Sequence, residues 1–204
     1  METTNKIVSI YTEATPNPAT MKFVVNQMLL PQNSVDFPKP EAAKDISPLA
    51  EALFTAFDYV SGVFIMNNFV TITKAGEESD WFEIAPQLRE FIRNYVSEGK
   101  QVVNTDALKA MVAANPDANP NEVSANDSEI VAKIKELLTK YVQPAVEMDG
   151  GAIVFRSFNN GVLTLGMQGS CSGCPSSTIT LKAGIEGLLK RMVPSVESVE
   201  AEML

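Results

Sequence analysis

Residues 152–177 read AIVFRSFNNGVLTLGMQGSCSGCPSS, and this run sets the architecture of the C-terminal half of the chain. Two apolar segments, 152–158 and 162–168, flank the tripeptide Asn-Asn-Gly at 159–161. An Asn-Gly pair between two such segments is a strong sequence signal for a β-hairpin. A loop with two cysteines follows, and then Pro175, a residue type favoured at the first position of a helix. The run therefore predicts an antiparallel hairpin, a cysteine loop and a helix, in that order.

A helix is also predicted before the hairpin, and a strand after the second helix. The earlier helix begins near Asp127-Ser128 and is expected to be ended by Pro144, with one apolar face formed by Ile130, Ile134, Leu137, Leu138 and Tyr141. The helix after the cysteine loop is expected to stop at Pro194, and residues 195–202 alternate as a short edge strand would. The C-terminal domain, residues 127–204, is therefore predicted as helix, strand, strand, helix, strand.

The first hundred residues predict a second small domain. We expect strands over 6–13, 21–26, 60–66 and 69–74, and a loop over 31–40, which holds three prolines. One helix is expected after the cap Ser47, and another is expected to open at Trp81 and close at Gly99. The fold class is thus α+β, with two small α/β-sandwich-type domains.

Between the two domains the sequence predicts a polar linker. Residues 100–126 include the stretch NPDANPN, which is rich in turn-forming residues and has no aliphatic anchor. A short helix over 105–114, capped by Thr105, is expected inside this linker. The predicted division is an N-terminal domain over 1–99, a linker over 100–126 and a C-terminal domain over 127–204.

The composition excludes several classes of function. The chain has 204 residues and no histidine, so it has no histidine general base and no histidine metal ligand. Its formal net charge of −9 repels phosphate backbones, and we expect no nucleic-acid partner. We expect no membrane partner either, because no run of about 18 apolar residues predicts a membrane span. The N-terminal residues lack the pattern of a signal peptide, so a cytoplasmic protein is expected.

Cys171 and Cys174 are the only cysteines, and their spacing places two thiols in one turn. Gly169 and Gly173 allow the backbone to bend closely around a ligand. The helix that follows offers its N-terminus, where backbone amides and the helix dipole favour a thiolate. In a reducing cytosol, such a pair is expected to bind a metal or a cluster, or to act in redox chemistry, rather than to form a structural disulfide.

Three interpretations of this pair are compatible with the sequence. A thiol–disulfide oxidoreductase has the same spacing at a helix start, although an antiparallel hairpin before the loop disfavours this class. A structural zinc site and the 2Fe–2S and 4Fe–4S clusters need four ligands, and one chain provides two cysteines. A two-fold dimer would supply four thiolates around one zinc ion or one cluster. A cluster held between subunits lies near solvent, which suits a cluster that is passed on.

The longer motif around the cysteines resembles a known family. Asp149-Gly150-Gly151 followed by GSCSGCPSS at 169–177 is similar to the NifU C-terminal domain of Nfu-type iron–sulfur cluster carriers, over about residues 127–202. The stretch TPNPATMKF at 15–23 resembles the opening motif of the Nfu N-terminal domain. Nearly the whole chain outside the linker is covered by this resemblance.

The resemblance implies a carrier rather than an enzyme. It implies a 4Fe–4S cluster held between two chains by Cys171 and Cys174 of each and transferred to apo-proteins. The implied partners are a second copy of the chain through the cysteine loop, cluster donors and apo iron–sulfur recipients. The lack of a transit-like start favours the bacterial cytosol.

Three further features are expected to be structural. Trp81, the single tryptophan, is expected to be a core or staple residue at a helix start, with a docking residue as the alternative. Asp149 is expected to be a turn residue, with a supporting role near the cluster as the alternative. Residues 15–23 are expected to form a turn between strands, with a recognition surface for recipients as the alternative.

Overall fold

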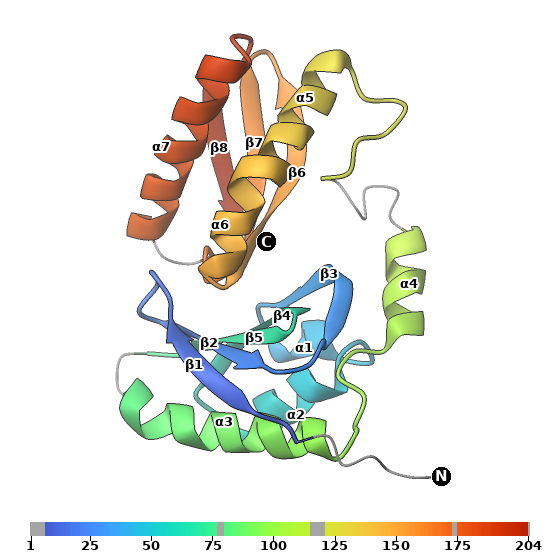
Figure 1. Ribbon diagram of the computed structural model, residues 1–204, viewed down its shortest axis with the longest axis vertical. Coiled ribbons are helices and arrows are strands. Elements are labelled where there is room, and N and C mark those ends of the chain that lie inside the picture. Colours follow the sequence, from blue (N-terminus) through green and yellow to red (C-terminus); the bar gives the residue numbers. More distant parts are fainter. Residues whose placement is uncertain (1–6, 77–79, 115–120, 173–174, 204) are drawn as a thin grey trace. The chain divides into compact units, whose positions relative to one another are not determined.

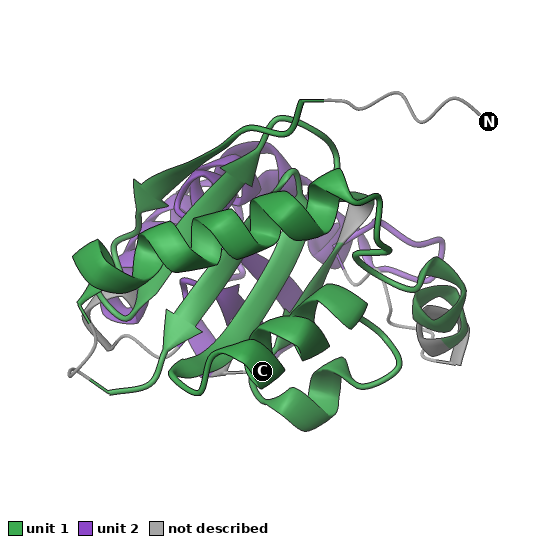
Figure 2. Ribbon diagram, turned by 90° about the horizontal axis from the view of Figure 1, so that it is seen from below, with its two compact units in different colours: residues 1–111 green, residues 112–204 purple. Residues whose placement is uncertain are grey.

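The computed structural model describes residues 7–76, 80–114, 121–172 and 175–203 of the 204-residue chain. The chain divides into two compact units, unit 1 over residues 1–111 and unit 2 over 112–204, which Figure 2 shows in different colours. Each unit combines one sheet with helices, so the predicted α+β class with two small domains is confirmed (Figure 1). The exact domain and linker boundaries given above stay a prediction.

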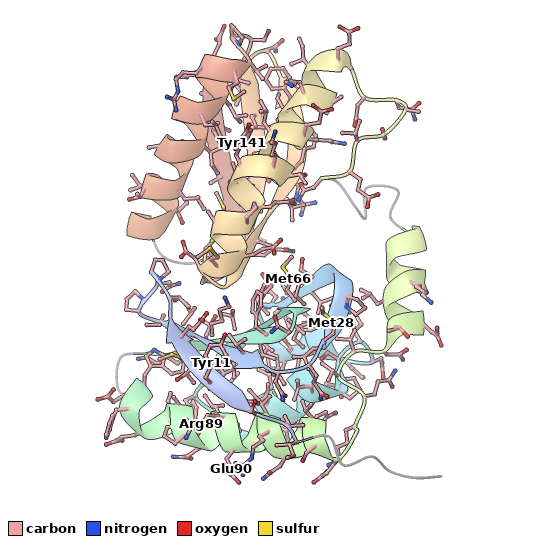
Figure 3. The ribbon with its side chains drawn as sticks, in the orientation of Figure 1. Tyr11, Met28, Met66, Arg89, Glu90 and Tyr141 are labelled. Carbon is pink, nitrogen blue, oxygen red and sulfur yellow. The ribbon has the colours of Figure 1, made fainter. Side chains whose placement is uncertain are left out.

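Unit 1 is built on a five-stranded antiparallel sheet of order β1-β2-β5-β4-β3. The strands are β1 (Ile10–Ala14), β2 (Thr20–Val25), β3 (Leu30–Phe37), β4 (Val60–Asn67) and β5 (Phe69–Lys74). Three helices accompany the sheet: α1 (Pro40–Ala43), α2 (Pro48–Ala56) and α3 (Trp81–Ser97). Helices α2 and α3 cover one face of it (Figure 2), and Arg89 and Glu90 point outward from α3 (Figure 3). The core between these layers includes Phe23, Leu49, Leu53, Ile65, Ile72, Leu88 and Ile92.

The prediction of a loop over residues 31–40 is wrong, because most of them belong to strand β3. This strand lies at the edge of the sheet, where a proline such as Pro31 is tolerated because it need not donate to a neighbouring strand. The pairing with β4 shifts register between Leu30 and Ser34, which gives the irregular start extra room. Val35 and Phe37 are buried, and this alternation was the strand signal that three prolines concealed.

The predicted helix starts and turns of unit 1 are confirmed. The Ser47 hydroxyl accepts a hydrogen bond from the Ala50 N–H at 3.1 Å, and Pro48 is the first helical residue of α2. Strands β4 and β5 form the expected hairpin, with Asn67 at φ 49° in the turn, and Gly99 has φ 69° just after α3. The local sequence signals at these positions therefore predicted the backbone correctly.

Helix α4 (Thr105–Ala114) confirms the short helix expected near the linker, but its cap is different. The Asn104 side-chain oxygen accepts hydrogen bonds from the N–H groups of Asp106 and Ala107, at 3.2 and 3.1 Å. Asn104 also donates its own N–H to the Ile46 carbonyl at 2.7 Å. The segment that leads into α4 is therefore attached to unit 1.

Unit 2 has a three-stranded sheet of order β6-β7-β8. Strands β6 (Gly151–Asn159) and β7 (Val162–Gly169) form the predicted antiparallel hairpin, and β8 (Ser198–Met203) lies parallel to β7 at the edge. The helices are α5 (Glu129–Leu137), α6 (Gln143–Met148) and α7 (Pro175–Met192). The core is formed by Ile134, Leu138, Val146, Ile153, Leu163, Leu165, Ile185, Leu189 and Val199. The predicted order helix, strand, strand, helix, strand is confirmed.

The expected helix end near Pro144 is wrong, because helical structure continues to Met148. A five-residue π-helical segment, η1 (Leu138–Val142), joins α5 to α6, and the Gln143 N–H donates to the Leu138 carbonyl. Pro144 then lies in the first turn of α6, directly after this segment. The π segment also shifts the buried face by one residue. As a result Tyr141 points to solvent (Figure 3), and its neighbour Val142 is buried.

The last residues of the predicted linker are attached to unit 2. The Asn121 side chain donates to the Ile153 carbonyl and accepts from the Phe155 N–H, both at 2.7 Å, along the free edge of β6. The Lys135 ammonium group donates to the Glu122 carbonyl at 3.1 Å and pairs with Asp127 at 2.9 Å. We call residues 121–127 the edge strap, because it covers backbone groups that an exposed edge strand would otherwise present.

Candidate functional site

The cysteine loop lies between the end of β7 and the start of α7 in unit 2 (Figure 1). Gly169, at φ 61°, turns the chain out of the strand. Cys171 follows with only 7% of its surface exposed, and it packs with the core of unit 2. Cys174 lies outside the described residues, so the structure places one of the two predicted ligands.

The turn Asp149-Gly150-Gly151 holds the start of the cysteine loop through two hydrogen bonds from Ser170. The Ser170 hydroxyl donates to the Asp149 carbonyl at 2.5 Å, and the Ser170 N–H donates to the Gly150 carbonyl at 3.2 Å. Gly150 has φ 82°, which lets both carbonyls face the loop. Asp149 is the turn residue that the sequence predicted, but Ser170 was missed, because its role depends on a backbone partner 21 residues away.

Gly151 gives Cys171 the space that its sulfur occupies. A Cβ atom at Gly151 would lie 2.7 Å from the Cys171 Sγ and 2.7 Å from the Gln168 carbonyl oxygen. Contacts this short do not occur without movement, and one of the two atoms belongs to the backbone of the paired strand. The second glycine of the Asp-Gly-Gly turn therefore acts as a spacer for the cysteine, beyond its part in the turn.

The surroundings of Cys171 disfavour the thiolate form of its side chain. Burial raises its pKa to about 11, a nearby Asp149 adds to the rise, and the Ser170 hydroxyl, 3.9 Å from the sulfur, works in the opposite direction. For Cys171, desolvation outweighs the thiolate-stabilising effect that was expected from the following helix. A soft metal ion that replaces the proton would supply the positive charge that this buried sulfur lacks.

The described part of one chain does not assemble a complete set of metal ligands around the cysteine. Among the described residues, no group of three or more cysteine, aspartate or glutamate side chains could hold a metal ion. A tetrahedral zinc site or a cluster would thus need ligands beyond those that the structure brings together.

Within the described residues, no helix is long and apolar enough to cross a membrane.

The strand topology around the cysteine loop does not disfavour a redox role, contrary to the expectation from the antiparallel hairpin. The hairpin before the loop is antiparallel, as predicted, but β7 and β8 are parallel and are connected through the cysteine loop and α7. The loop therefore occupies the strand-to-helix turn of a βαβ unit, as a thioredoxin-like pair would. The raised pKa of Cys171 is a separate argument against that role, because reactive dithiols depend on a lowered thiol pKa.

The motif at residues 15–23 of unit 1 is held by hydrogen bonds within that unit. The side chain of Asn17 accepts a hydrogen bond from the Ala19 N–H at 3.0 Å, and its carbonyl accepts one from the Thr20 N–H at 2.9 Å. The half-buried Trp81 donates its indole N–H to the Pro18 carbonyl at 2.9 Å. Residues 15–19 therefore form the predicted turn between β1 and β2, whereas residues 20–23 already belong to β2. Of its two expected structural roles, Trp81 has that of the staple, because it fastens this turn.

Comparison with known proteins identifies the two units. The family model for the scaffold protein Nfu/NifU N-terminal domain matches residues 10–99, and the model for the NifU-like domain matches residues 134–200. A solution structure of a NifU-like protein from Saccharomyces cerevisiae aligns at 23% identity with a TM-score of 0.43, over 51% of this chain and 90% of that chain.

Curated relatives match along almost the whole chain. The human NFU1 iron-sulfur cluster scaffold homolog, mitochondrial, is 39% identical over 95% of this chain and 72% of its own length. The proteins of the same name from Drosophila persimilis and Drosophila virilis are 42% and 41% identical over 94% of this chain, which spans 64% and 60% of their length.

These names correct one prediction and establish the family. The relatives are named as mitochondrial, so the predicted cytoplasmic location, including the bacterial cytosol, is contradicted. The two domain models match in the order that the motifs at 15–23 and 169–177 predicted. Given these matches and 39% identity over nearly its full length, the chain belongs to the Nfu/NifU family of scaffold proteins.

Proposed function

We propose that this protein is an iron–sulfur cluster carrier. Two chains bind one 4Fe–4S cluster through Cys171 and Cys174 of each chain, and the cluster is then passed to apo-proteins. The observation that carries the proposal is the prepared position of Cys171: a buried thiol, held by the Asp149–Gly151 turn, in a chain of a scaffold family that has two cysteines in all.

The stoichiometry follows from the ligand count. A 4Fe–4S cluster is held by four cysteine thiolates, and each chain contributes two. The chain has no histidine, and carboxylates are poor ligands for soft cluster iron, so a second pair of thiolates is the economical completion. A two-fold axis through the cysteine loops brings the pairs together, and the functional unit is therefore a homodimer.

Transfer requires ligand exchange rather than catalysis of a covalent reaction on a substrate. The cluster is the cargo, and the thiols of a recipient replace Cys171 and Cys174 one at a time. The protein is accordingly a carrier and not an enzyme, and its further partners are cluster donors and apo iron–sulfur proteins. The name of the human relative, an iron-sulfur cluster scaffold homolog, supports this assignment.

The domain arrangement fits the same function. We propose an N-terminal domain over 1–99, a linker over 100–126 and a cluster-binding domain over 127–204. A recipient bound to the N-terminal domain would be kept at a high effective concentration near the cysteine loop, because the linker confines it to the same neighbourhood.

Anaerobic reconstitution of the full chain with iron and sulfide tests the proposal. The expected product is a brown dimer with about four iron atoms per dimer, a 4Fe–4S Mössbauer spectrum, and the capacity to activate an apo-4Fe–4S enzyme. Cys171→Ser and Cys174→Ser should each abolish the colour, whereas Ser195→Ala, which lies between α7 and β8, should not. A colourless monomer from the unaltered chain contradicts the proposal.

Thiol–disulfide exchange is the second candidate, and the βαβ setting of the cysteine loop favours it. It predicts a monomer with a measurable dithiol–disulfide potential and disulfide-reductase activity. A structural dimer stapled by zinc is the third interpretation, and it predicts one tightly held zinc ion per dimer and no transfer of iron. Metal analysis and the reductase assay on the same preparation separate all three.

A further inference from the structure

We infer that Met148 and Ile179 form an apolar rim around the cysteine loop, and that the occupant of this rim is the same region of a second copy of the chain. The inference rests on the proposed cluster-bridged dimer and names the side chains that would hold its two halves together. We call these two residues the rim.

Both rim residues are strongly exposed although they are large and apolar. Met148 is 76% exposed and Ile179 is 68% exposed, more than any other large apolar side chain among the described residues of unit 2. Exposing such side chains to water is unfavourable, and apolar surface that gathers in one place is typical of a binding site. Methionine is in addition a residue type enriched in protein interfaces.

Each rim residue is next in sequence to a residue that hydrogen-bonds to the cysteine loop. Met148 ends α6 and directly precedes Asp149, whose carbonyl accepts the hydrogen bond from the Ser170 hydroxyl. Ile179 lies in the first turns of α7, next to Thr178, whose hydroxyl donates to the Cys171 carbonyl at 3.3 Å. Figure 1 shows the end of α6 and the start of α7 at the same end of unit 2.

The stretch of chain that leads from the turn of the hairpin through the cysteine loop to Ile179 contains no charged residue. No aspartate, glutamate, lysine or arginine occurs from 157 to 181, in a chain that is 20% charged. Within β7 this absence reflects burial, but the run continues through the cysteine loop and into α7, where Ile179 and Thr180 are exposed. The charged residues that border this run in the sequence are Arg156 and Lys182. An apolar, charge-poor centre with a charged border is the usual anatomy of an interface.

The second copy is the occupant because the site inside the rim is incomplete without it. One chain brings two thiolates, so whatever covers the loop has to bring two more, and the partner copy does so by symmetry. A two-fold contact places the same patch of both chains face to face. Each dimer would then bury four rim side chains around the cluster.

The test compares the cluster-loaded dimers of the full chain, by sedimentation, with those of matched double variants. Met148→Gln with Ile179→Thr should weaken dimerisation of the loaded protein at least tenfold and make the cluster dissociate at correspondingly higher protein concentration. The control makes the same substitutions away from the loop, Met192→Gln with Ile130→Thr, at side chains that are 45% and 39% exposed. This control should leave the dissociation constant unchanged.

A conservative pair, Met148→Leu with Ile179→Val, separates apolar contact from loss of folding, since it should keep the dimer at nearly its original strength. The inference is overturned if the polar rim variant dimerises as tightly as the control, or if the conservative pair is as weak as the polar pair. It is also overturned if the polar variant dimerises normally but transfers its cluster slowly, because the rim would then bind recipients. If the unaltered chain itself forms no loaded dimer, the proposed function fails instead.

Discussion

Replacing Gly151 by alanine is expected to displace the cysteine loop and destabilise unit 2. The added Cβ would lie 2.7 Å from the Cys171 Sγ, 2.7 Å from the Gln168 carbonyl oxygen and 3.1 Å from the Cys171 nitrogen. The sulfur could rotate away, but the other two atoms belong to the backbone of β7 and of the loop that follows it. Relief therefore requires β6 and β7 to separate locally, or Cys171 to move outward.

The expected magnitude follows from the cost of overpacking. Forcing one methyl group into a closely packed site costs about 1–3 kcal/mol. For a domain of this size each kcal/mol lowers the melting temperature by about 4–8 °C, so a cost of 2 kcal/mol corresponds to roughly 8–16 °C. Because the same movement shifts the Cys171 sulfur, the variant should also bind less iron per chain during reconstitution.

Far-UV circular dichroism measures the melting of both units, and the fluorescence of Trp81, the only tryptophan, reports on unit 1 alone. The matched control is Gly184→Ala in α7, where an added Cβ has no atom within 4 Å and removes up to about 1 kcal/mol of glycine's helix penalty. A Gly151→Ala protein that melts and loads iron like the unaltered chain would refute the reasoning. A change seen only in Trp81 fluorescence would refute it as well.

Three other substitutions test parts of the fold. Asn121→Ala removes both hydrogen bonds from the edge strap to β6 and should lower the free energy of unfolding by about 1–3 kcal/mol, measured in urea. The pKa of Asp127 is lowered from 3.8, chiefly by the hydrogen bond from the backbone N–H of Ser124. Its contribution to stability is therefore present above pH 3.8 and is lost as the pH falls through the lowered pKa. Asp127→Asn should remove this acid dependence, which urea unfolding at neutral and acid pH would measure. Trp81→Phe loses the hydrogen bond to the Pro18 carbonyl and should lower the free energy of unfolding by about 0.5–1.5 kcal/mol, measured by circular dichroism. An unchanged free energy of unfolding would show that this bond does not fasten the turn.

Turns and helix starts could be predicted because their causes are local. The Asn160-Gly161 turn, with φ values of 49° and 80°, needs residues that accept the left-handed conformation, and the sequence displays them. The Ser128 cap of α5 is visible in the same way, since its hydroxyl accepts from the Val131 N–H at 3.3 Å. In such places the residue that determines the backbone lies within the turn or cap that it forms.

Predictions failed where the outcome depends on structure that the local sequence motif does not reveal. Pro31 signals a loop until its strand is seen to lie at the sheet edge, and Pro144 signals a helix end until the π-helical segment before it is seen. The protonation of Cys171 depends on burial by the core of unit 2, which outweighs the local signal of a helix start. Each of these outcomes required knowledge of the neighbours.

The features that prepare the candidate site are mostly backbone groups, and this bears on how a carrier can both hold and release its cargo. Two carbonyl groups fix Ser170, and a missing side chain at Gly151 leaves the space for the Cys171 sulfur, so one chain keeps the sulfur in place before any metal arrives. Preparing the thiol in this way reduces the ordering that binding would otherwise require. Among the described residues, no further metal ligands gather around it. On the proposed function, the remaining affinity comes from Cys174 and from the two thiolates of the second chain. On the proposed function, a ligand set divided between two chains binds tightly while they are paired and weakly once they part, and a recipient needs only to compete with half of it.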